Sequence, residues 1–478
     1  MKTRLPFLTK LIYGSGDWGL SSSGMMRSVF YAIYMTDVVG LDPRLASLGA
    51  LIGIIWDAIN DPLIGRLSDR VRTRWGRRRP FLLWFAVPFA AGFTLLWWAP
   101  PWESQLALTI YITCAYMLAD TLTTLVSVPF LSLTPELAAD YDSRTSLTGF
   151  RTFFQLTASL TVVIAAPAIV DAMLAAGYSQ QQGFMLTAAI FGSMGALSFL
   201  LIFWRVRETA SPEQNETLPI RQTLQIAWQN IPFRFAVGIH LLNWSAVDMV
   251  AILVPYFLLY WIARGDLLAK VNLFGLPVAL ESAFFGLLML ACILSLPFWL
   301  WLAHRSSKPL AYLWGMTIFL SAQLLLFGVG PGQMTPALVL AVLAGAGISA
   351  AYTLPDSIFP DIIEWDELRT RRRQEGLYYG TRAFVRKLTG ALTIFGALQI
   401  LGWAGYQAPP EGATLFRQPD SVLLAIRLLI SPIGALLLLG AATLAWFYPL
   451  TREKHGRLRH LLARRKQRRQ EKMQKETL

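Results

Sequence analysis

The sequence is short of cysteine, of catalytic histidine motifs and of charge, and each shortage excludes a class of protein. Its two cysteines, Cys114 and Cys292, both lie in apolar runs, so they indicate neither a disulfide framework nor a thiolate metal site. The four histidines form no HExxH motif, and no GxSxG motif with partner residues is present, which argues against an intramembrane enzyme. Charged residues make up only 15% of the chain, against about 25% in an ordinary soluble domain.

Apolar residues take the place of the missing charge. They make up 55% of the 478 residues, and the mean hydropathy is +0.47. An apolar stretch of about 20 residues is long enough to cross a bilayer as a helix. The sequence therefore predicts an all-α membrane protein with twelve transmembrane helices. The predicted spans are 12–37, 45–65, 80–99, 105–133, 147–171, 184–204, 232–262, 278–303, 309–329, 335–358, 378–402 and 421–448.

Basic residues are distributed unevenly between the loops. Loops 66–79, 304–308 and 361–377 contain Lys or Arg, whereas loops 100–104, 172–183, 329–336 and 403–420 contain almost none. Cytoplasmic loops are usually the basic ones, so both termini are expected in the cytoplasm and the protein in the cell membrane. No cleavable signal is recognised, since the first ten residues carry three basic side chains ahead of a long apolar run.

Two polar segments divide the chain. Residues 205–231 contain two prolines and are predicted to link an N-terminal six-helix bundle, 1–204, to a C-terminal one, 232–450. Two helical bundles around a midplane site resemble the organisation of major facilitator transporters. Residues 451–478 contain eleven Lys or Arg against three Glu. This basic tail is expected to bind anionic lipid headgroups and no nucleic acid, since no aromatic residues are interleaved with it.

The second span carries three polar residues on one face. Asp57, Asn60 and Asp61 lie at i, i+3 and i+4. An acid at mid-membrane costs roughly 3 kcal/mol, so two acids on one face indicate a function. Two carboxylates and an amide oxygen supply part of the coordination of a hard cation such as Na⁺, and crowded carboxylates can instead carry protons. The alternative is that the acids serve only as salt-bridge partners in a gate.

Other polar residues occur at membrane depth in the first and fourth spans. Asp17 and Arg27 in the first span need partners or a water-filled cavity. In the fourth span Asp120 and Ser127 lie on one polar stripe, together with Thr123 and Thr124 between them. We interpret Asp17 and Arg27 as candidate residues of a solute pathway and the stripe as a polar face turned to it.

The fifth and eleventh spans carry deep bases. Arg151 lies too far into the fifth span for an easy snorkel, so it serves either a solute or a structural pairing with an acid. In the eleventh span Arg382 and Arg386 are one turn apart on one face, and Lys387 is offset from them. At least one of the three must face elsewhere, and Lys387 is predicted to face inward.

Several segments resemble one transporter family. They are YMTDVVGL at 34–41, IWDAINDPLIG at 55–65, SVPFLSLTPELAADYDSR at 127–144, PDIIEWDELRTRRRQEGLYYG at 360–380 and RKLTGAL at 386–392. These segments resemble the glycoside–pentoside–hexuronide:cation symporters, the melibiose-permease family of the major facilitator superfamily. Because they are spread over both halves, the resemblance covers nearly the whole chain.

The resemblance implies roles for individual residues. It implies that Asp57, Asn60 and Asp61 belong to a cation site. Asp17 and Arg151 resemble the residues that bind sugar hydroxyls, as a carboxylate and a guanidinium can bond vicinal hydroxyls in pairs. Lys387 resembles the lysine between the two sites. The residues that resemble the cytoplasmic gate are Arg144, Asp361, Glu364 and Arg373.

Three positions depart from the melibiose permease. Ser127 replaces an aspartate that serves both sites there, Leu131 replaces an aromatic residue, and Tyr352 replaces a tryptophan of the tenth helix. One carboxylate fewer favours H⁺ or a weaker Na⁺ site. Asp120, two turns before Ser127, is a candidate replacement. Arg27 has no counterpart that we recognise there, and it favours an anionic sugar such as a hexuronide.

The sequence thus predicts a secondary active symporter, coupled to Na⁺ or H⁺, that moves a sugar, glycoside or hexuronide by alternating access. The expected cation site is Asp57, Asn60, Asp61 and Ser127. The expected solute site is Asp17, Arg27, Asp120, Arg151, Tyr352 and Lys387. No cofactor is expected besides the coupling cation, and a monomer is expected. The alternatives are a lysophospholipid transporter, since relatives of the family move such lipids, and a sensor or scaffold that binds solute without flux.

Overall fold

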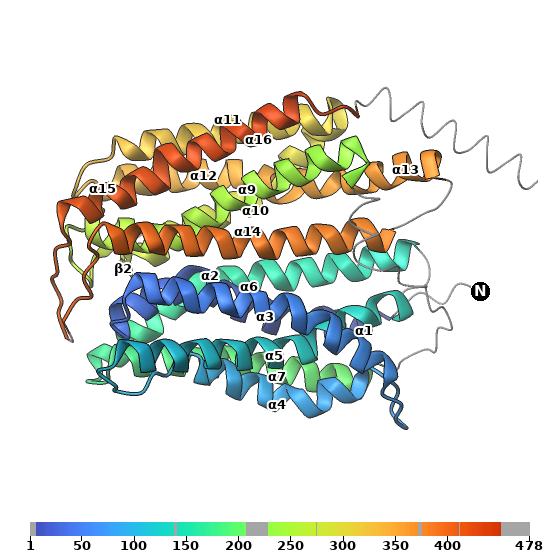
Figure 1. Ribbon diagram of the computed structural model, residues 1–478, viewed down its shortest axis with the longest axis horizontal. Coiled ribbons are helices and arrows are strands. Elements are labelled where there is room, and N and C mark those ends of the chain that lie inside the picture. The colour runs from blue at the N-terminus through green and yellow to red at the C-terminus, as the bar shows by residue number, and fades with distance from the viewer. Residues whose placement is uncertain are drawn as a thin grey trace, which may run out of the picture.

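The computed structural model of the protein describes residues 6–137, 141–206, 228–273, 275–370, 375–410 and 412–450. Most of the predicted linker 205–231 and the whole predicted tail 451–478 lie outside these residues. The described residues form long helices that run side by side (Figure 1). The N-terminal half packs as one bundle and the C-terminal half as a second bundle beside it.

The N-terminal bundle consists of helices that pack mainly on one another. Within it α4 packs on α5 and α7, α3 packs on α5, and α2 packs on α6 and α7. The elements are α1 (Phe7–Gly14), α2 (Gly16–Ile33), the π-helical turn η1 (Tyr34–Val38), α3 (Pro43–Arg70), α4 (Arg79–Leu95), α5 (Gln105–Leu137), α6 (Tyr141–Ala175) and α7 (Gln180–Arg205).

The C-terminal bundle repeats this pattern, with one short sheet added. Within the C-terminal bundle α12 packs on α10 and α11, and α9 packs on α14 and α16. The elements are α9 (Ile231–Tyr256), η2 (Phe257–Ile262), β1 (Lys270–Leu273), β2 (Leu276–Ala279), α10 (Leu280–Arg305), α11 (Lys308–Phe327), α12 (Met334–Ser357), α13 (Phe359–Thr370), α14 (Glu375–Trp403), α15 (Asp420–Leu428), η3 (Leu429–Ile433) and α16 (Gly434–Trp446).

Local sequence explains where several helices start. Pro43 occupies the first turn of α3, and the Asp42 side chain accepts a hydrogen bond from the Arg44 amide, 2.8 Å away. Ser179 and Gln182 form a capping box at the start of α7. Antiparallel strands β1 and β2 are joined at Gly275, whose φ of 86° favours glycine.

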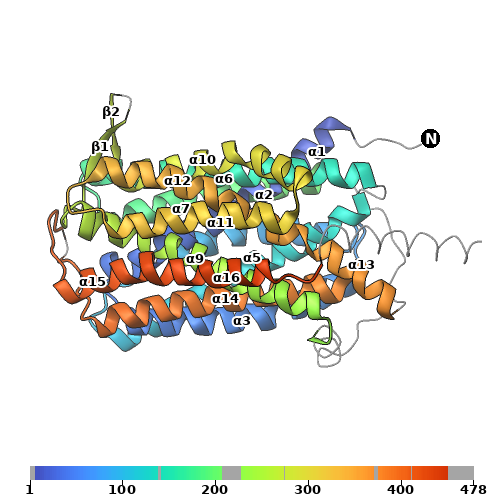
Figure 2. The same ribbon diagram turned by 90° about the horizontal axis from the view of Figure 1, so that it is seen from above.

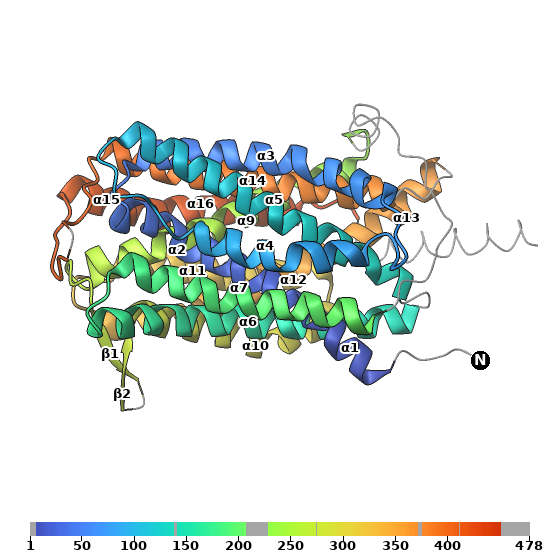
Figure 3. The same cartoon turned by 90° about the horizontal axis from the view of Figure 1, so that it is seen from below.

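Three helix pairs join the bundles: α3 with α14, α6 with α10, and α2 with α9. We call the end that carries the β1–β2 hairpin the hairpin end, and the opposite end, where α1 and α13 lie, the terminal end (Figure 2). The hairpin projects from the side of the bundle (Figure 3). The main contacts between the bundles are therefore made by helices that run between these two ends.

The predicted fold class is confirmed. Within the described residues, ten helices are long and apolar enough to cross a membrane, and Arg79–Leu95 is a shorter apolar helix. Each of the twelve predicted spans coincides with a helix or with consecutive helical segments. The first span is interrupted at Ser15, between α1 and α2, and the eighth begins two residues later than predicted because β2 precedes it. Much of the predicted loop 361–377 is helical, since α13 extends to Thr370.

Candidate functional site

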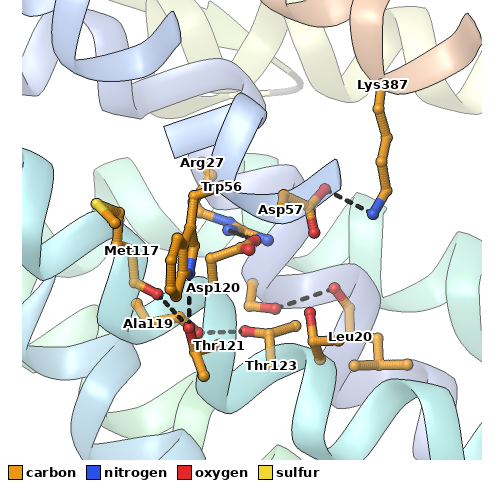
Figure 4. Close-up of polar contacts among 12 residues, drawn as sticks. Leu20, Arg27, Trp56, Asp57, Met117, Ala119, Asp120, Thr121, Thr123 and Lys387 are labelled. Atoms are coloured by element: carbon orange, nitrogen blue, oxygen red, sulfur yellow. Dashed lines mark hydrogen bonds and ion pairs between the residues drawn. The ribbon is translucent and has the colours of Figure 1, made fainter. Parts of the chain in front are cut away.

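An ion-paired cluster crosses the interface between the bundles at mid-depth. The Lys387 ammonium of α14 lies 2.6 Å from a carboxylate oxygen of Asp57 on α3 (Figure 4). It also pairs with Asp61, one turn further along α3. The helix spacing of Asp57 and Asp61 places both acids on the face of α3 that packs on α14. One lysine of the C-terminal bundle thus bridges two acids of the N-terminal bundle.

Polar side chains of α3 and α5 surround these acids. Thr124 donates a hydrogen bond of 3.1 Å from its hydroxyl to Asp61. Ser127 lies one turn along α5 from Thr124, half-buried on the same helix face. Asn60 is only 4% exposed, and its side-chain nitrogen has no hydrogen-bond partner among the described residues. The hydroxyl and amide oxygens of these groups can act as neutral ligands of a small cation.

A second buried pair lies beside the acids of α3. The guanidinium of Arg27 on α2 is 3.7 Å from the carboxylate of Asp120 on α5, and it lies 5.7 Å from the ring centre of Tyr116. The carboxylate of Asp57 lies next to that of Asp120 (Figure 4). When ionised, Asp57, Asp61 and Asp120 face two positive charges, those of Arg27 and Lys387. The cluster therefore has room for one further positive charge.

The first and fifth spans supply a third pair. Arg151 of α6 donates to Asp17 of α2 through Nε, at 2.5 Å, and through a terminal nitrogen, at 3.2 Å. Another nitrogen of Arg151 lies 3.4 Å from the Thr134 hydroxyl. The Tyr13 hydroxyl is 2.8 Å from Thr134 and donates to the carbonyl of Phe130 at 2.6 Å. Asp17 and Arg151 thus present a paired carboxylate and guanidinium, the arrangement that can bond neighbouring hydroxyls.

Sequence reasoning did not pair Asp248 with Arg386. Asp248 of α9 accepts two hydrogen bonds from Arg386 of α14, of 2.7 and 2.8 Å. The Arg386 guanidinium also lies 4.1 Å from the ring centre of Trp244, and this ring meets Tyr352 edge to face at 4.8 Å. Asn243, another polar residue of this span, bonds instead to Tyr312 and to the carbonyl of Ala351. Asn243 therefore holds helices together within its own bundle.

Hydrogen bonds join the two bundles at the hairpin end. The hydroxyls of Tyr260 and Tyr406, both from the C-terminal half, donate to the carboxylate of Asp37 in η1. The Thr36 hydroxyl lies 2.9 Å from that of Tyr256 on α9. These residues are buried or half-buried, so they hold the two bundles together at the hairpin end, where Asp37 also lines a pocket with Leu259 and Glu281.

Comparisons with known proteins decide the family. A model of the family described as MFS/sugar transport protein matches residues 12–452. The chain belongs to this family. It is a multi-pass membrane symporter of the major facilitator superfamily and not an enzyme.

Individual relatives differ in what their names say they carry. An uncharacterized symporter of Synechocystis is 32% identical, covering 97% of this chain and 98% of that protein. An isoprimeverose transporter of Lactiplantibacillus pentosus is 26% identical, covering 85% and 82%. A sodium-dependent lysophosphatidylcholine symporter of Gallus gallus is 25% identical, covering 95% and 88%.

A solved structure of similar fold is that of a bacterial homologue of the human lysosomal transporter Spinster, in an inward-facing and occupied conformation. Its TM-score is 0.65 at 11% sequence identity, covering 95% of this chain and 99% of that one. At this identity the likeness concerns the fold alone.

Two of the four predicted gate residues, Asp361 and Glu364, lie at the terminal end. Asp361 of α13 pairs with Lys308 of α11, 2.7 Å away, within the C-terminal bundle. Glu364 lies one turn further along α13, half-buried. The side chain of Arg144 and the whole of Arg373 lie outside the described residues. Their part in a gate stays a prediction.

Proposed function

We propose that the protein couples the movement of one monovalent cation, Na⁺ or H⁺, to the uptake of a sugar or glycoside by alternating access. One observation carries the proposal: Lys387 of one bundle is paired with Asp57 and Asp61 of the other. The positively charged Lys387 side chain lies between two acids, and this position indicates where a free cation can compete with it for the same carboxylates.

The coupling step follows from charge. A cation that binds Asp57 and Asp61 neutralises carboxylates that otherwise hold Lys387, so the ion pairs that tie the lysine and its helix α14 to α3 weaken while the lysine stays within the cluster. Truncating one partner of a buried ion pair is costly, since it leaves an uncompensated charge, whereas exchange of one cation for another avoids that cost. Solute and cation then raise each other's affinity by the same factor, because linkage is reciprocal.

The charge of the cluster supports a stoichiometry of one. Asp57, Asp61 and Asp120 carry three negative charges when ionised, and Arg27 and Lys387 carry two positive charges. One Na⁺ or one proton completes neutrality, while a divalent cation would leave an excess of positive charge in a site of low dielectric. Asp120 thereby supplies the third negative charge of the cluster, which the uncharged Ser127 does not supply.

The solute is proposed to bind between the bundles, near Asp17 and Arg151. Asp61 and Lys387 support this position, because their side chains are 36% and 31% exposed although they lie at mid-depth of long helices. Because hydrogen bonds join the bundles at the hairpin end, we infer that this exposed surface is reached from the terminal end. The basic loops support a cytoplasmic terminal end and a cell-membrane location. Each bundle contributes to the site, so one chain is proposed to suffice for transport, with the basic tail on anionic lipid.

The second candidate solute is a lysophospholipid. It is favoured by the lysophosphatidylcholine symporters among the relatives, which match as much of the chain as the sugar transporters do. Against it, the deep side chains between the bundles form acid–base pairs, and an acyl chain requires an apolar groove.

The test is uptake into proteoliposomes that contain the purified protein. Neutral glycosides, glucuronides and lysophosphatidylcholine are offered in turn, with a Na⁺ gradient and a pH gradient imposed separately. Concentrative uptake of a glycoside under one gradient is the expected result. Uptake of lysophosphatidylcholine alone, or binding of a glycoside without flux under either gradient, contradicts the proposal. Protein-free liposomes provide the baseline for leakage.

A further inference from the structure

The Asp248–Arg386 pair lies on the face of α14 that is turned away from lipid. Phe384, Leu388 and Leu392 are 48%, 40% and 52% exposed and mark the lipid-facing side of this helix. Successive helical residues are about 100° apart, which places Arg386 well round the helix from these three residues. Its side chain is nevertheless 35% exposed. We conclude that Arg386 borders an opening inside the protein.

On α12, Tyr352 is likewise exposed although it is turned away from lipid. Val339 and Val342 are 62% and 41% exposed and mark the lipid-facing side there, and Tyr352 lies about 140° and about 80° round the helix from them. Tyr352 is still 40% exposed. The aromatic ring and the guanidinium therefore border the same opening, because both contact Trp244 between them.

The pair also repeats an arrangement of the other bundle. Asp17 and Arg151 come from the first and fifth membrane helices of the N-terminal bundle, and Asp248 and Arg386 come from the first and fifth of the C-terminal bundle. Both arginines lie about three turns from the start of their helix. Transporters with repeated bundles place their binding sites at the repeat interface. Each bundle thus offers one carboxylate–guanidinium pair.

We propose that Asp248, Arg386, Trp244 and Tyr352 form a second half-site for the solute, and that this half-site selects a neutral, hydroxyl-rich ring. The inference rests on the proposed function and adds the class of solute. Hydroxyls can donate to the free lone pairs of Asp248 and accept from the N–H groups of Arg386 that Asp248 leaves unused. The exposed Tyr352 ring offers a flat surface to the apolar face of a sugar.

Charge balance favours a neutral solute over an anion. Asp248 already neutralises Arg386 through two hydrogen bonds, so the half-site carries no net charge. A phosphate or a carboxylate gains little from such a pair, because the acid repels it as the base attracts it. Arg386 and Lys387 are consecutive residues in the same turn of α14. A movement of Lys387 at the cation site therefore also moves Arg386 in the solute half-site.

The experiment measures KM for a neutral glycoside in cation-driven uptake by proteoliposomes. The variants are Arg386→Lys, which keeps the charge but removes the paired donors, and Asp248→Asn combined with Arg386→Gln, which removes both charges. We expect KM to rise about tenfold or more in both, with the half-maximal cation concentration unchanged. The matched control is Arg427→Lys, because Arg427 also lies on aromatic rings, those of Trp261 and Phe327, at 4.2 and 4.4 Å.

Three results would overturn the inference. The first is an unchanged KM in both variants. The second is a KM for a glucuronide that rises more than the KM for the neutral glycoside. The third is wild-type protein that moves no glycoside, which also ends the proposed function and is recognised before any variant is made. If the ion-pair variants fail to fold, as judged by melting temperature, Tyr352→Leu is used, since its exposed ring tolerates the change, and the same rise in KM is expected.

Discussion

The ammonium of Lys387 on α14 lies 2.6 Å from the carboxylate of Asp57 on α3, and these two helices belong to different bundles. In alternating access the bundles rock against each other, so a bond across their interface opposes the movement. In the proposed mechanism this pair holds the bundles together until another cation neutralises the acid. A small ion would thereby control helices of some 30 residues.

Lys387→Gln is predicted to separate cation binding from transport. Without the ammonium, Asp57 and Asp61 lose their tethered partner, and a free cation meets no competitor for them. We expect the cation to bind about tenfold more tightly, while concentrative uptake is lost because the acids hold the ion. The measurement combines cation-dependent protection against heat with gradient-driven uptake. Unchanged concentrative uptake in this variant is incompatible with the proposed exchange.

Asp57→Asn and Asp61→Asn are each predicted to abolish cation-driven uptake. Either change removes one carboxylate and leaves the charge of Lys387 without one of its two partners. The protein is still expected to insert in the membrane, because an amide is less costly there than an acid. Uptake under each gradient is compared with that of Asp42→Asn, a change at an exposed acid that pairs with Arg44 outside the cluster. Accumulation equal to wild type removes Asp57 and Asp61 from the ion site.

Arg27 and Asp120 are predicted to tune the affinity for the cation in opposite directions. Arg27→Gln makes the cluster more negative and lowers the half-maximal cation concentration, whereas Asp120→Asn raises it. The double variant is expected to lie near wild type, because the two charges compensate each other. This double-mutant cycle isolates their interaction from effects on folding. Shifts in the same direction for both single variants contradict the charge balance proposed for the cluster.

The arrangement of helices could be predicted from the sequence, because a membrane span needs about 20 apolar residues and leaves a long continuous signal. The hairpin could not, since strands of four residues, 270–273 and 276–279, are too short to show alternation. Helix α13 was hidden because residues 359–370 are half polar and too few for a membrane span, so they were assigned to the loop that contains Arg369.

The ion-pair partner of each charged residue within the membrane spans was harder to predict than the position of that residue along its span. Helical spacing shows that Arg386 and Lys387 point about 100° apart, but it does not say which helix lies on each side. In the structure α14 packs on both α3 and α9. Lys387 therefore pairs with acids of α3, and Arg386 pairs with Asp248 of α9. The same limit applies to Arg27, whose partner Asp120 lies more than 90 residues away in the sequence.

Gly19→Ala is predicted to destabilise the N-terminal bundle. A Cβ atom at Gly19 on α2 would lie 2.5 Å from the Cα of Gly195 on α7, so the two helices would have to move apart. Overpacking of this kind costs about 1–3 kcal/mol. The matched control is Gly24→Ala on the same helix, where a Cβ meets nothing within 4 Å. A lower melting temperature is expected for Gly19→Ala only, and equal values for both variants would refute the close contact.

The hydrogen bonds from Tyr260 and Tyr406 to Asp37 are predicted to stabilise the closed state of the hairpin end, and we call these three residues the latch. Asp37 belongs to the N-terminal bundle, and both of its phenol donors, Tyr260 and Tyr406, belong to the C-terminal half. Replacing the two tyrosines by phenylalanine keeps their rings and removes both hydrogen bonds. Each bond contributes about 1 kcal/mol, so their loss shifts the population toward a state open at this end by about tenfold or more.

The shift can be followed by the reactivity of a buried thiol near the latch. Ala32 on α2 is 1% exposed, so Ala32→Cys, made together with Cys114→Ser and Cys292→Ser, reports on opening when an impermeant maleimide is added from outside. Faster labelling is expected when Tyr260 and Tyr406 are both replaced. The control is Tyr178→Phe, an exposed tyrosine that is not part of the latch. If labelling is no faster in the double variant than in this control, closure depends on the packing of η1 against η2 and not on the carboxylate of Asp37.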